Sequence, residues 1–408
     1  MEKYFFIFDL DGTLTTKETL PYIADKFNLK EIEALTKKAI KGEVPYIENF
    51  IDRINILRRI EVSKIDGLLS KIDLFEKIVD FINTHSTICA IATTNLDVWI
   101  KSLTSNVKAK IYTSKAVIKN NKIEKLSYIL KKEEIVRKYQ EMGYKVVFIG
   151  NGHNDLEAMR IADISIATGL IHYPANSLLS IVDYLIFDEN RLIYFLNQIL
   201  KPENDITLVL SAAGIGSRLG LNQTKVLLRF NDITLLQRHI ENFYNIKDLR
   251  IVIGYQANDV IREALKYRKD ILFVYNHDYF YTKTGFSYYL GAKYANDYVI
   301  EWDGDLVVDK KDIKKLLVKK EYIAGSDIHS SEPVYLKVKD AKVIDFSFEK
   351  GEYEWSGPCC MRKEKIALNK GNVFEILKPY LPMDFIKING MDIDTFEDYK
   401  KVKELYEL

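Results

Sequence analysis

Short apolar runs, each followed at once by glycine, acidic or hydroxyl residues, recur along the whole chain and restrict the folds open to it. Three of them are residues 4–8, 146–149 and 206–210. Apolar runs of this length bounded by turn residues are typical of buried strands, and segments with helical periodicity lie between them. This alternation predicts an α/β chain with parallel sheets and helices on both faces. Ligands of such sheets collect at the carboxyl ends of the strands, so residues there are the candidate site residues.

The length of the chain predicts two domains. A chain of 408 residues exceeds what one hydrophobic core usually organises, and two domains of roughly 200 residues each are the natural expectation. The polar segment 201–205, which contains a proline, is typical of a linker. We therefore expect two doubly wound domains, at 1–201 and 205–408.

The first domain is expected to carry an inserted helical cap at about residues 15–85. This stretch has helical periodicity and few strand signals. A cap of this kind would close over the site, exclude water and select the substrate. The predicted helices are 18–27, 30–41, 47–57 and 62–69.

Charge and composition argue against several classes of protein. With 59 Lys and Arg against 58 Asp and Glu, the net charge is +1, so the overall balance favours neither nucleic acid nor an anionic membrane as partner. No apolar run approaches membrane-spanning length and no signal-peptide pattern is evident, which predicts a cytoplasmic protein without membrane insertion. The cysteines, Cys89, Cys359 and Cys360, fit neither a disulfide framework nor a zinc site, and we expect buried reduced thiols.

The first apolar run ends in two aspartates, Asp9 and Asp11, followed by Gly12 and Thr13. Two carboxylates at a strand end suit phosphoryl transfer, because one can attack the phosphorus, the other can handle its proton, and both can help to hold Mg²⁺. The Asp-x-Asp-Gly-Thr segment resembles the first motif of the haloacid dehalogenase superfamily, most closely its phosphoserine-phosphatase-like branch. That resemblance implies a phosphomonoester substrate, Asp9 as nucleophile and Asp11 as general acid and base.

Further motifs of that superfamily follow in chain order. After the apolar run 88–92 come Thr93 and Thr94, where the resemblance implies a hydroxyl and a backbone amide on the phosphate. Lys132 opens a helical segment and matches the lysine that neutralises the phosphate, with Lys131 as the alternative.

The segment 150–155 resembles the superfamily's metal-binding loop, with one difference. Asn151 stands where an aspartate is common, and an amide oxygen is a weaker ligand than a carboxylate. A non-catalytic sensing or docking domain is therefore an alternative for the first half. The magnesium ligands that the resemblance implies are Asp9, Asp11, Asn151 and Asp155.

The run 206–210 leads into a glycine-rich loop, residues 211–225. Its glycines permit close approach of a ligand to the backbone, and Arg218 and Lys225 add cations, so the loop is suited to a triphosphate. It has neither the Walker sequence nor the dinucleotide spacing. It resembles the signature loop of sugar-phosphate and alcohol-phosphate nucleotidyltransferases, and Thr224, in place of the usual proline, resembles the phosphocholine cytidylyltransferase branch. The resemblance implies nucleotide binding by Ala212, Ala213, Gly214, Gly216 and Ser217.

Two acidic segments complete the predicted second site. Asp303 and Asp305 follow the apolar run 298–302, and Asp394 lies in an Ile-Asp-Thr-x-Glu-Asp segment near the C-terminus. Nucleotidyl transfer needs a metal between the pyrophosphate and the attacked phosphate, and therefore a carboxylate at a strand end near the glycine loop. The family pattern implies Asp305 and Asp394 as Mg²⁺ ligands, with Asp303 in reserve.

Three other features bear on the substrates. Ser287 is expected at the start of a helix, either placing amides near an anion or acting as a plain cap. Residues 332–361 alternate in polarity and predict an antiparallel arm that closes the acceptor side. An aromatic box for a quaternary ammonium is conceivable, although tyrosines at such spacings are more often core. Its members would be Tyr279, Tyr281, Tyr288, Tyr289 and Trp302.

Taken together, the resemblance implies a bifunctional enzyme. The second half would transfer a cytidylyl group from CTP to a phosphorylated alcohol with Mg²⁺, although UTP and GTP stay open. A phosphatase joined to such an enzyme resembles a pathway that activates one phosphorylated polyol, couples it to a second and removes the leftover phosphate. We therefore expect inositol-1-phosphate as the acceptor, as in the inositol-1-phosphate cytidylyltransferases, with phosphocholine as its rival.

Overall fold

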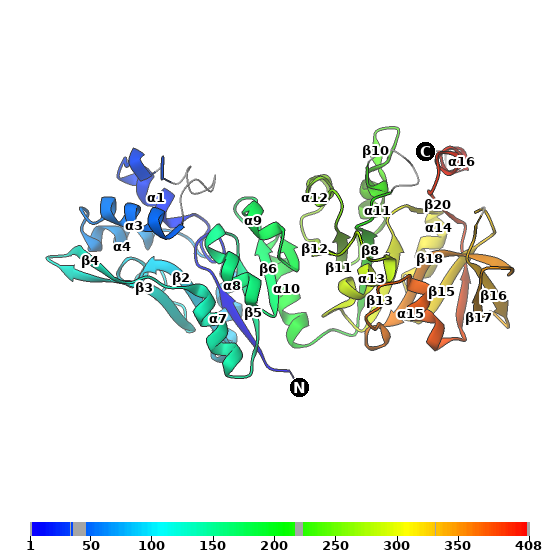
Figure 1. The fold of residues 1–408 in the computed structure, drawn as a ribbon, viewed down its shortest axis with the longest axis horizontal. Helices are drawn as coiled ribbons and strands as arrows, with labels where there is room; N and C mark the ends of the chain where they lie inside the picture. Colours follow the sequence, from blue (N-terminus) through cyan, green and yellow to red (C-terminus); the bar gives the residue numbers. More distant parts are fainter. Residues whose placement is uncertain (1, 33, 36–45, 217–222, 331, 406–408) are drawn as a thin grey trace. The chain divides into compact units, whose positions relative to one another are not determined.

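Residues Tyr4–Phe8 form strand β1, and the computed structural model places a parallel neighbour on each side of it. The structure describes residues 2–32, 34–35, 46–216, 223–330 and 332–405 (Figure 1). The chain divides into two units, Met1–Ile193 and Tyr194–Leu408. The division falls inside helix α10 (Glu189–Leu200), before the linker predicted at 201–205.

The first unit is built on a sheet with strand order β7-β6-β5-β1-β2-β3-β4. All its pairs are parallel except β3 with β4. Phe6, Ile7 and Phe8 are fully buried, because a parallel sheet is covered on both faces and its strands read as continuous apolar runs. The other strands are β2 (Cys89–Leu96), β3 (Lys110–Lys119), β4 (Lys122–Tyr128), β5 (Lys145–Gly150), β6 (Ile164–Thr168) and β7 (Tyr184–Ile186).

The β3–β4 hairpin was not predicted from the sequence. Its residues are largely polar and exposed, so the apolar signal of a buried strand is missing. Asn120 and Asn121 join the two strands with φ of 49° and 58°. Positive φ at both central residues is what a two-residue hairpin turn requires, and asparagine tolerates it. The Asn-Asn pair was therefore the signal that could have identified this hairpin.

Helices occupy the stretch predicted to be the cap. They are α1 (Thr19–Lys26), α3 (Tyr46–Leu57), α4 (Val62–Leu69) and α5 (Glu76–Thr84). Three of the predicted helices agree to within one residue at each end, whereas most of the predicted helix 30–41 lies outside the described residues. The remaining helices of this unit are α6 (Asp97–Ile100), α7 (Lys132–Glu141), α8 (Leu156–Ile161) and α9 (Asn176–Leu179).

The second unit begins with four parallel strands in the order β12-β11-β8-β13. The glycine loop follows β8, so it leaves the sheet between β11 and β13. Helix α13 packs against β8 and β11 (Figure 1). The strands are β8 (Ile206–Ala212), β11 (Asp248–Ile253), β12 (Leu272–Tyr275) and β13 (Tyr298–Asp303).

The predicted antiparallel arm is present and belongs to a larger arrangement. Strand β18 pairs antiparallel with β13, and the successive pairings β18-β16-β17-β19-β15-β18 close into a ring. The sequence could not show this closure, because it depends on β15 and β19, which lie outside the alternating segment. The five strands are β15 (Tyr322–Ser326), β16 (Tyr335–Lys339), β17 (Lys342–Ser347), β18 (Tyr353–Arg362) and β19 (Met383–Lys387).

The apolar pattern of residues 233–244 is typical of a helix over that whole stretch, but the helix in the structure starts later. Residues 229–230 and 233–234 form the short pair β9 (Arg229–Phe230) and β10 (Ile233–Thr234), and α11 begins at Leu235. The hydroxyl of Thr234 accepts a hydrogen bond from Gln237 N at 3.1 Å, which makes Thr234 the N-cap. The other elements are α11 (Leu235–Asn242), α12 (Ala257–Ala264), α13 (Thr284–Ala292), β14 (Leu306–Val308), α14 (Lys310–Leu316), α15 (Val373–Leu377), β20 (Gly390–Asp392) and α16 (Phe396–Leu405).

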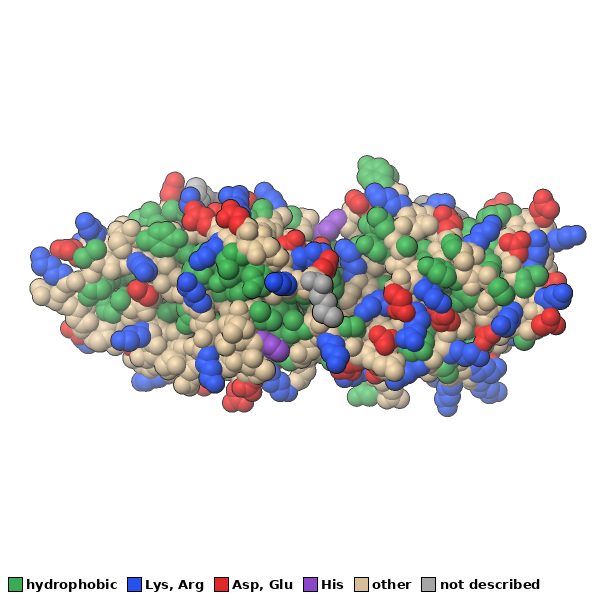
Figure 2. Space-filling model, turned by 90° about the horizontal axis from the view of Figure 1, so that it is seen from below, with side chains coloured by type: hydrophobic (Ala, Val, Ile, Leu, Met, Phe, Trp, Pro, Cys, Tyr) green, Lys and Arg blue, Asp and Glu red, His purple; other side chains and the backbone are tan. Residues whose placement is uncertain are grey.

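Surface and membrane features can be stated for the described residues. Figure 2 shows Lys and Arg side chains interspersed with Asp and Glu over the displayed face. Within the described part of the chain, no helix combines the length and the apolar character needed to cross a bilayer. Cys89, Cys359 and Cys360 are buried free thiols, as predicted.

Candidate active sites

The first site is organised around a buried lysine. Lys132, the first residue of α7, places Nζ 2.6 Å from Asp9 Oδ1 and 2.6 Å from Asp155 Oδ1. All three side chains are at most 3% exposed. Burial alone would lower the pKa of Lys132, but the charges of Asp155 and Asp9 raise it above its ordinary value. Lys131, the alternative, is exposed and lies 3.9 Å from Glu134, so the geometry favours Lys132.

Asp9 lies directly after β1 and is 2% exposed. Burial, followed by the charge of Asp155, raises the pKa of Asp9 well above its ordinary value, although Lys132 opposes the shift. A carboxylate held against an ammonium in a dry site is poorly solvated, and it is thereby available to attack phosphorus.

Asp11 has a different environment. Its Oδ1 accepts a hydrogen bond from Thr19 N at 2.9 Å, and its Oδ2 accepts one from Asn95 Nδ2 at 2.6 Å. Burial, followed by the charge of Glu18, raises the pKa of Asp11 to about 6. A carboxyl group that titrates near neutrality is suited to general acid and base work.

Thr93 lies inside β2, because the strand continues to Leu96 instead of ending at residue 92. The hydroxyl of Thr93 accepts hydrogen bonds from Asn95 N at 3.2 Å and Asn95 Nδ2 at 3.3 Å. Asn95 therefore joins Thr93 to Asp11, and sequence reasoning missed it. Its position directly after Thr93 and Thr94 was the available signal.

The loop after β5 explains how Asp155 is held. Asp155 Oδ2 accepts hydrogen bonds from Asn151 N at 3.0 Å and Gly152 N at 2.9 Å, and its Oδ1 contacts Lys132. The side-chain amide of Asn151 donates to Glu18 Oε1 at 3.3 Å. Both carboxylate oxygens of Asp155 thus accept hydrogen bonds. Glu18, like Asn95, is a residue of this site that sequence reasoning missed.

The donor set of this site is compatible with Mg²⁺. Within the described ranges, no group of three or more His, Cys, Asp or Glu is spaced to hold a metal ion. Mg²⁺ is commonly bound by one or two carboxylates together with water and substrate phosphate. Asp9 and Asp11 supply two carboxylates and Asn151 an amide oxygen, which fits that mode without a cage of protein ligands.

The second unit contains a cavity of about 490 Å³. It lies over the carboxyl ends of β8, β12 and β13, as expected for an open parallel sheet. Four loop residues predicted to bind nucleotide line it, whereas Ser217 and Arg218 lie outside the described residues. The lining residues are Ser211, Ala212, Ala213, Gly214, Gly216, Thr224, Lys225, Val226, Asn276, Tyr279, Thr282, Lys283, Thr284, Ser287, Asp303, Gly304, Asp305, Asn372, Asp392 and Asp394.

Lys225 joins the two predicted metal carboxylates. Its Nζ lies 2.7 Å from Asp305 Oδ2 and 2.5 Å from Asp394 Oδ1. Burial lowers the pKa of Lys225, but the charges of Asp305 and Asp394 raise it above its ordinary value. Two carboxylates that share one ammonium can also provide the oxygen ligands that Mg²⁺ takes alongside phosphate and water.

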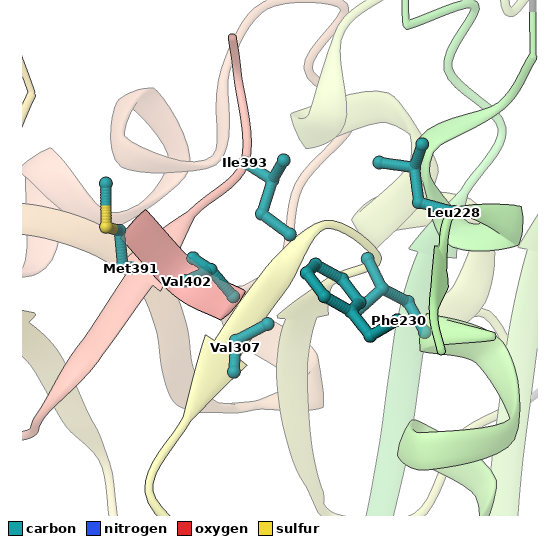
Figure 3. Packing of buried hydrophobic residues seen from close by; sticks show 7 residues of the cluster. Leu228, Phe230, Val307, Met391, Ile393 and Val402 are labelled. Carbon is teal, nitrogen blue, oxygen red and sulfur yellow. The ribbon is translucent and has the colours of Figure 1, made fainter. Parts of the chain in front are cut away.

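An apolar cluster positions these three residues (Figure 3). Leu228 and Phe230 follow Lys225, Val307 follows Asp305 on β14, and Ile393 precedes Asp394. The sequence-distant segments are also linked by a hydrogen bond from Ile393 N to Asp305 O at 3.2 Å. Burial of apolar surface in this cluster therefore holds the segments that carry Lys225, Asp305 and Asp394 together.

Asp303, the reserve ligand, is held differently from Asp305. Burial, followed by the charge of Asp305, raises the pKa of Asp303 to about 7. The neighbouring Glu301 accepts a hydrogen bond from Ser211 Oγ at 3.2 Å, and burial, followed by the charge of Asp303, raises its pKa well above the ordinary value. Because Lys225 Nζ lies 2.7 Å from Asp305 Oδ2, the geometry favours Asp305 over Asp303 as the partner of Lys225.

Among the described residues of the glycine loop, Gly216 occupies a position that requires glycine. Gly216 has a φ of +67°, and a Cβ there would lie 3.0 Å from Gln223 O and 3.1 Å from Lys225 Cγ. A side chain at this position would strain the backbone and press on Lys225. Gly216 thus keeps the loop close to the lysine.

Ser287 is not a helix cap. Helix α13 begins at Thr284 with Lys283 as its N-cap, so Ser287 lies within the helix. Its Oγ accepts a hydrogen bond from Asn276 Nδ2 at 3.1 Å, and it lines the cavity. The prediction of a cap was wrong because the helix starts four residues earlier than a cap at Ser287 would require, with Lys283 as its N-cap.

The aromatic residues considered for a box are dispersed. Tyr288 is fully buried and donates to Val299 O at 2.9 Å, and Trp302 packs edge-on against Phe243. Tyr281 is 84% exposed. Of the five residues, Tyr279 alone lines the cavity within the described part of the unit.

The predicted arm does not supply the described lining of the cavity. Residues 332–361 contribute none of the described lining residues, whereas Asn372 and the start of α13 do. The arm instead packs against Asp303, which lines the cavity. Gly357 lies so close to it that a Cβ at Gly357 would be 2.6 Å from Asp303 Oδ2.

Comparisons with known proteins show similarity to two kinds of enzyme. A family model described as a domain of unknown function (DUF6564) matches residues 224–352. A phosphoserine phosphatase from Methanocaldococcus jannaschii is 22% identical over 180 residues, which make up 41% of this chain and 85% of that protein.

Two solved structures are similar to half of the chain. The CTP:phosphocholine cytidylyltransferase from Streptococcus pneumoniae has 21% identity and a TM-score of 0.41, covering 50% of this chain and 99% of that one. The inositol-1-phosphate CTP transferase from T. maritima has 16% identity and a TM-score of 0.44, covering 50% of this chain and 96% of that one. These similarities, to a phosphoserine phosphatase and to cytidylyltransferases, are to the same two kinds of enzyme that the motifs of the sequence resemble.

Proposed function

We propose that the second unit transfers a cytidylyl group from CTP to a phosphorylated alcohol. The observation that carries this proposal is the contact of Lys225 with both Asp305 and Asp394 at the glycine-loop cavity. An oxygen of the acceptor phosphate attacks the α-phosphorus, the bond to the bridging oxygen of pyrophosphate breaks, and a CDP-alcohol and pyrophosphate are formed. No covalent enzyme intermediate is required.

The chain's own residues contribute charge and orientation to this reaction. Lys225 brings a cation to the triphosphate and holds Asp305 and Asp394 together against their mutual repulsion. Gly214 and Gly216 let the backbone approach the phosphates. Asp305 and Asp394 would hold Mg²⁺, which when bound neutralises charge on the phosphates.

For the acceptor we propose inositol-1-phosphate. A quaternary ammonium is recognised by an aromatic cage, and Tyr288 and Trp302 belong to the core. The described wall of the cavity carries hydrogen-bonding side chains instead, among them Asn276, Thr282 and Asn372. These groups suit a polyol better than phosphocholine.

The first unit is proposed to be a phosphomonoesterase of the same pathway. Asp9 attacks the phosphorus while the alcohol leaves, and Asp11 gives the leaving oxygen a proton. Asp11 then takes a proton from the water that attacks the phosphorylated Asp9, and the bond between phosphorus and Asp9 breaks to release phosphate. Lys132 offsets the charge of the phosphate, and Thr93 contacts it. Asp9, Asp11 and Asn151 would hold Mg²⁺. Asp155, which the resemblance also implies as a ligand, would instead hold Lys132 in place, because its oxygens contact Lys132 and the loop amides. A cytoplasmic location is part of the same proposal.

Pyrophosphate release tests the main proposal. The full chain would be incubated with Mg²⁺, one of CTP, UTP or GTP, and either inositol-1-phosphate or phosphocholine. We expect CTP with inositol-1-phosphate to be the fastest pair. If no phosphorylated alcohol releases pyrophosphate with any nucleotide, the proposal fails.

Phosphate release tests the first unit separately. A panel of phosphate esters with Mg²⁺ would identify a substrate, and Asp9→Asn should strongly lower its turnover. Binding of a phosphate ester without release of phosphate, in the wild type as in Asp9→Asn, would instead support the sensing or docking domain suggested by Asn151.

A further inference from the structure

A buried histidine contacts the turn that carries the carboxylates of the second site. His239 lies on α11, is 2% exposed, and has Nε2 3.0 Å from Gly304 O. A carbonyl oxygen only accepts, so Nε2 carries the proton and donates it. Among the described residues Nδ1 has no partner, and the tautomer with a proton on Nε2 leaves only a lone pair there. Burial lowers the pKa of His239 to about 4, so the ring is neutral at pH 7.

The same residue is also held through its other backbone group. Gly304 N donates to Ser211 O at 3.0 Å, and Ser211 belongs to β8, the strand that leads into the glycine loop. A Cβ at Gly304 would lie 2.7 Å from Ser211 O and 3.4 Å from Val226. Gly304 is thus fixed between the loop strand and α11.

Neighbouring rings fix the orientation of the imidazole. The His239 ring lies parallel to Phe243, with centroids 6.2 Å apart, and edge-on to Trp302 at 6.3 Å. Phe243 and Trp302 are both buried. Close packing of this kind keeps the Nε2–H of His239 directed at Gly304 O.

We propose that His239 is a positioning residue for nucleotidyl transfer: its Nε2–H fixes the Gly304 peptide and thereby places Asp305 opposite Lys225 and Asp394. This inference rests on the proposed function, because it assigns Asp305 to the reacting site. Groups that orient a metal ligand from behind typically change metal affinity by about 10- to 100-fold when they are removed. His239 is such a group, although it lies outside the cavity.

Three variants of the full chain separate positioning from packing. His239→Leu removes the donor and keeps apolar bulk, whereas His239→Gln retains an N–H at a similar reach. Ile240→Ala is the matched control, because it opens space on the same helix and leaves the hydrogen bond to Gly304 intact. Mn²⁺ serves as the metal probe, and its binding in the presence of CTP is measured by electron paramagnetic resonance, together with Tm.

We expect His239→Leu to weaken Mn²⁺ binding about tenfold and His239→Gln to retain most of the wild-type affinity. Ile240→Ala should bind Mn²⁺ within about twofold of wild type, even if its Tm falls as far as that of His239→Leu. Unchanged Mn²⁺ binding in His239→Leu would overturn the inference. Equal weakening in Ile240→Ala would do the same, because the effect would then be one of packing.

A measurement without metal or nucleotide keeps the inference testable if His239→Leu does not fold. Nitrogen NMR of the wild type should show a neutral imidazole protonated on Nε2 from pH 5 to pH 8. A ring protonated on Nδ1 would exclude donation to Gly304 and overturn the inference. Failure of pyrophosphate release in the wild type would count against the proposed function alone, since it leaves this tautomer unchanged.

Discussion

The two units use the same charge pattern in different surroundings. Lys132 and Lys225 each contact two carboxylates from segments far apart in the sequence. The side chain of Lys132 is 1% exposed and its partners are at most 3% exposed, whereas Lys225 is 15% exposed and its partners 22% and 36%. The first lysine is part of a dry core and the second belongs to an open cavity. A lysine between two carboxylates therefore contributes more to stability where it is buried, as in the first unit, than where water reaches it, as in the second.

Removal of each lysine should show the largest difference. Lys132→Met leaves Asp9 and Asp155 buried without a counter-charge, and breaking a buried pair costs about 3–5 kcal/mol. Lys225→Met should cost less, because water screens these partly exposed pairs better than it screens buried ones. Hydrogen exchange of β1 and β8 amides would report the two units separately. Equal losses of protection would contradict the contrast in burial.

Carboxylate variants should separate the two activities. Asp9→Asn is expected to lower phosphate release by about 10²- to 10³-fold and leave pyrophosphate release unchanged. Asp305→Asn should do the reverse, since each substitution removes a charge that serves one of the two reactions. Both reactions would be assayed on the same preparations. Loss of both activities in either single variant would indicate that the sites are not independent.

The free energy of unfolding should depend on pH differently in the wild type and in Asp11→Asn. Its pKa is raised from 3.8 to about 6, so between these values the native state binds more protons than the unfolded state and stability falls as pH rises. The slope is at most about 1.4 kcal/mol per pH unit. Asp11→Asn lacks this loss, so relative to wild type it should gain stability from pH 4 to pH 6 and then remain level. Unfolding with EDTA present would measure it, and parallel curves for the two proteins would refute the assignment.

The smallest expected effect concerns the carboxylate missing from the first site. Asn151→Asp replaces a hydrogen bond to Glu18 with repulsion, which should cost about 1 kcal/mol without metal. Added Mg²⁺ should reverse that loss and lower the Mg²⁺ concentration needed for phosphate release. Titration of Tm with Mg²⁺ for both proteins checks this. A variant that Mg²⁺ does not stabilise more than the wild type would show that residue 151 is not a ligand.

Much of the fold was accessible from local sequence. The strands 4–8 and 298–302 and the helix 62–69 were predicted closely, because buried parallel strands and amphipathic helices have regular apolar patterns. The β3–β4 hairpin and the later start of α11 were not, since exposed strands and capping threonines leave weak apolar signals. Closure of the five-strand ring likewise depends on pairings between distant segments.

The sequence by itself determined which chemical groups stand at the strand ends: aspartates after β1 and β13, and glycines after β8. That information is local, because a strand, a turn and the residue type are all encoded within about ten neighbouring positions. Only the tertiary structure decided which groups meet. It brought Lys225 to Asp305 and Asp394, placed Tyr288 and Trp302 in the core, and set His239 against Gly304. These choices depend on packing between distant segments, which no local pattern records.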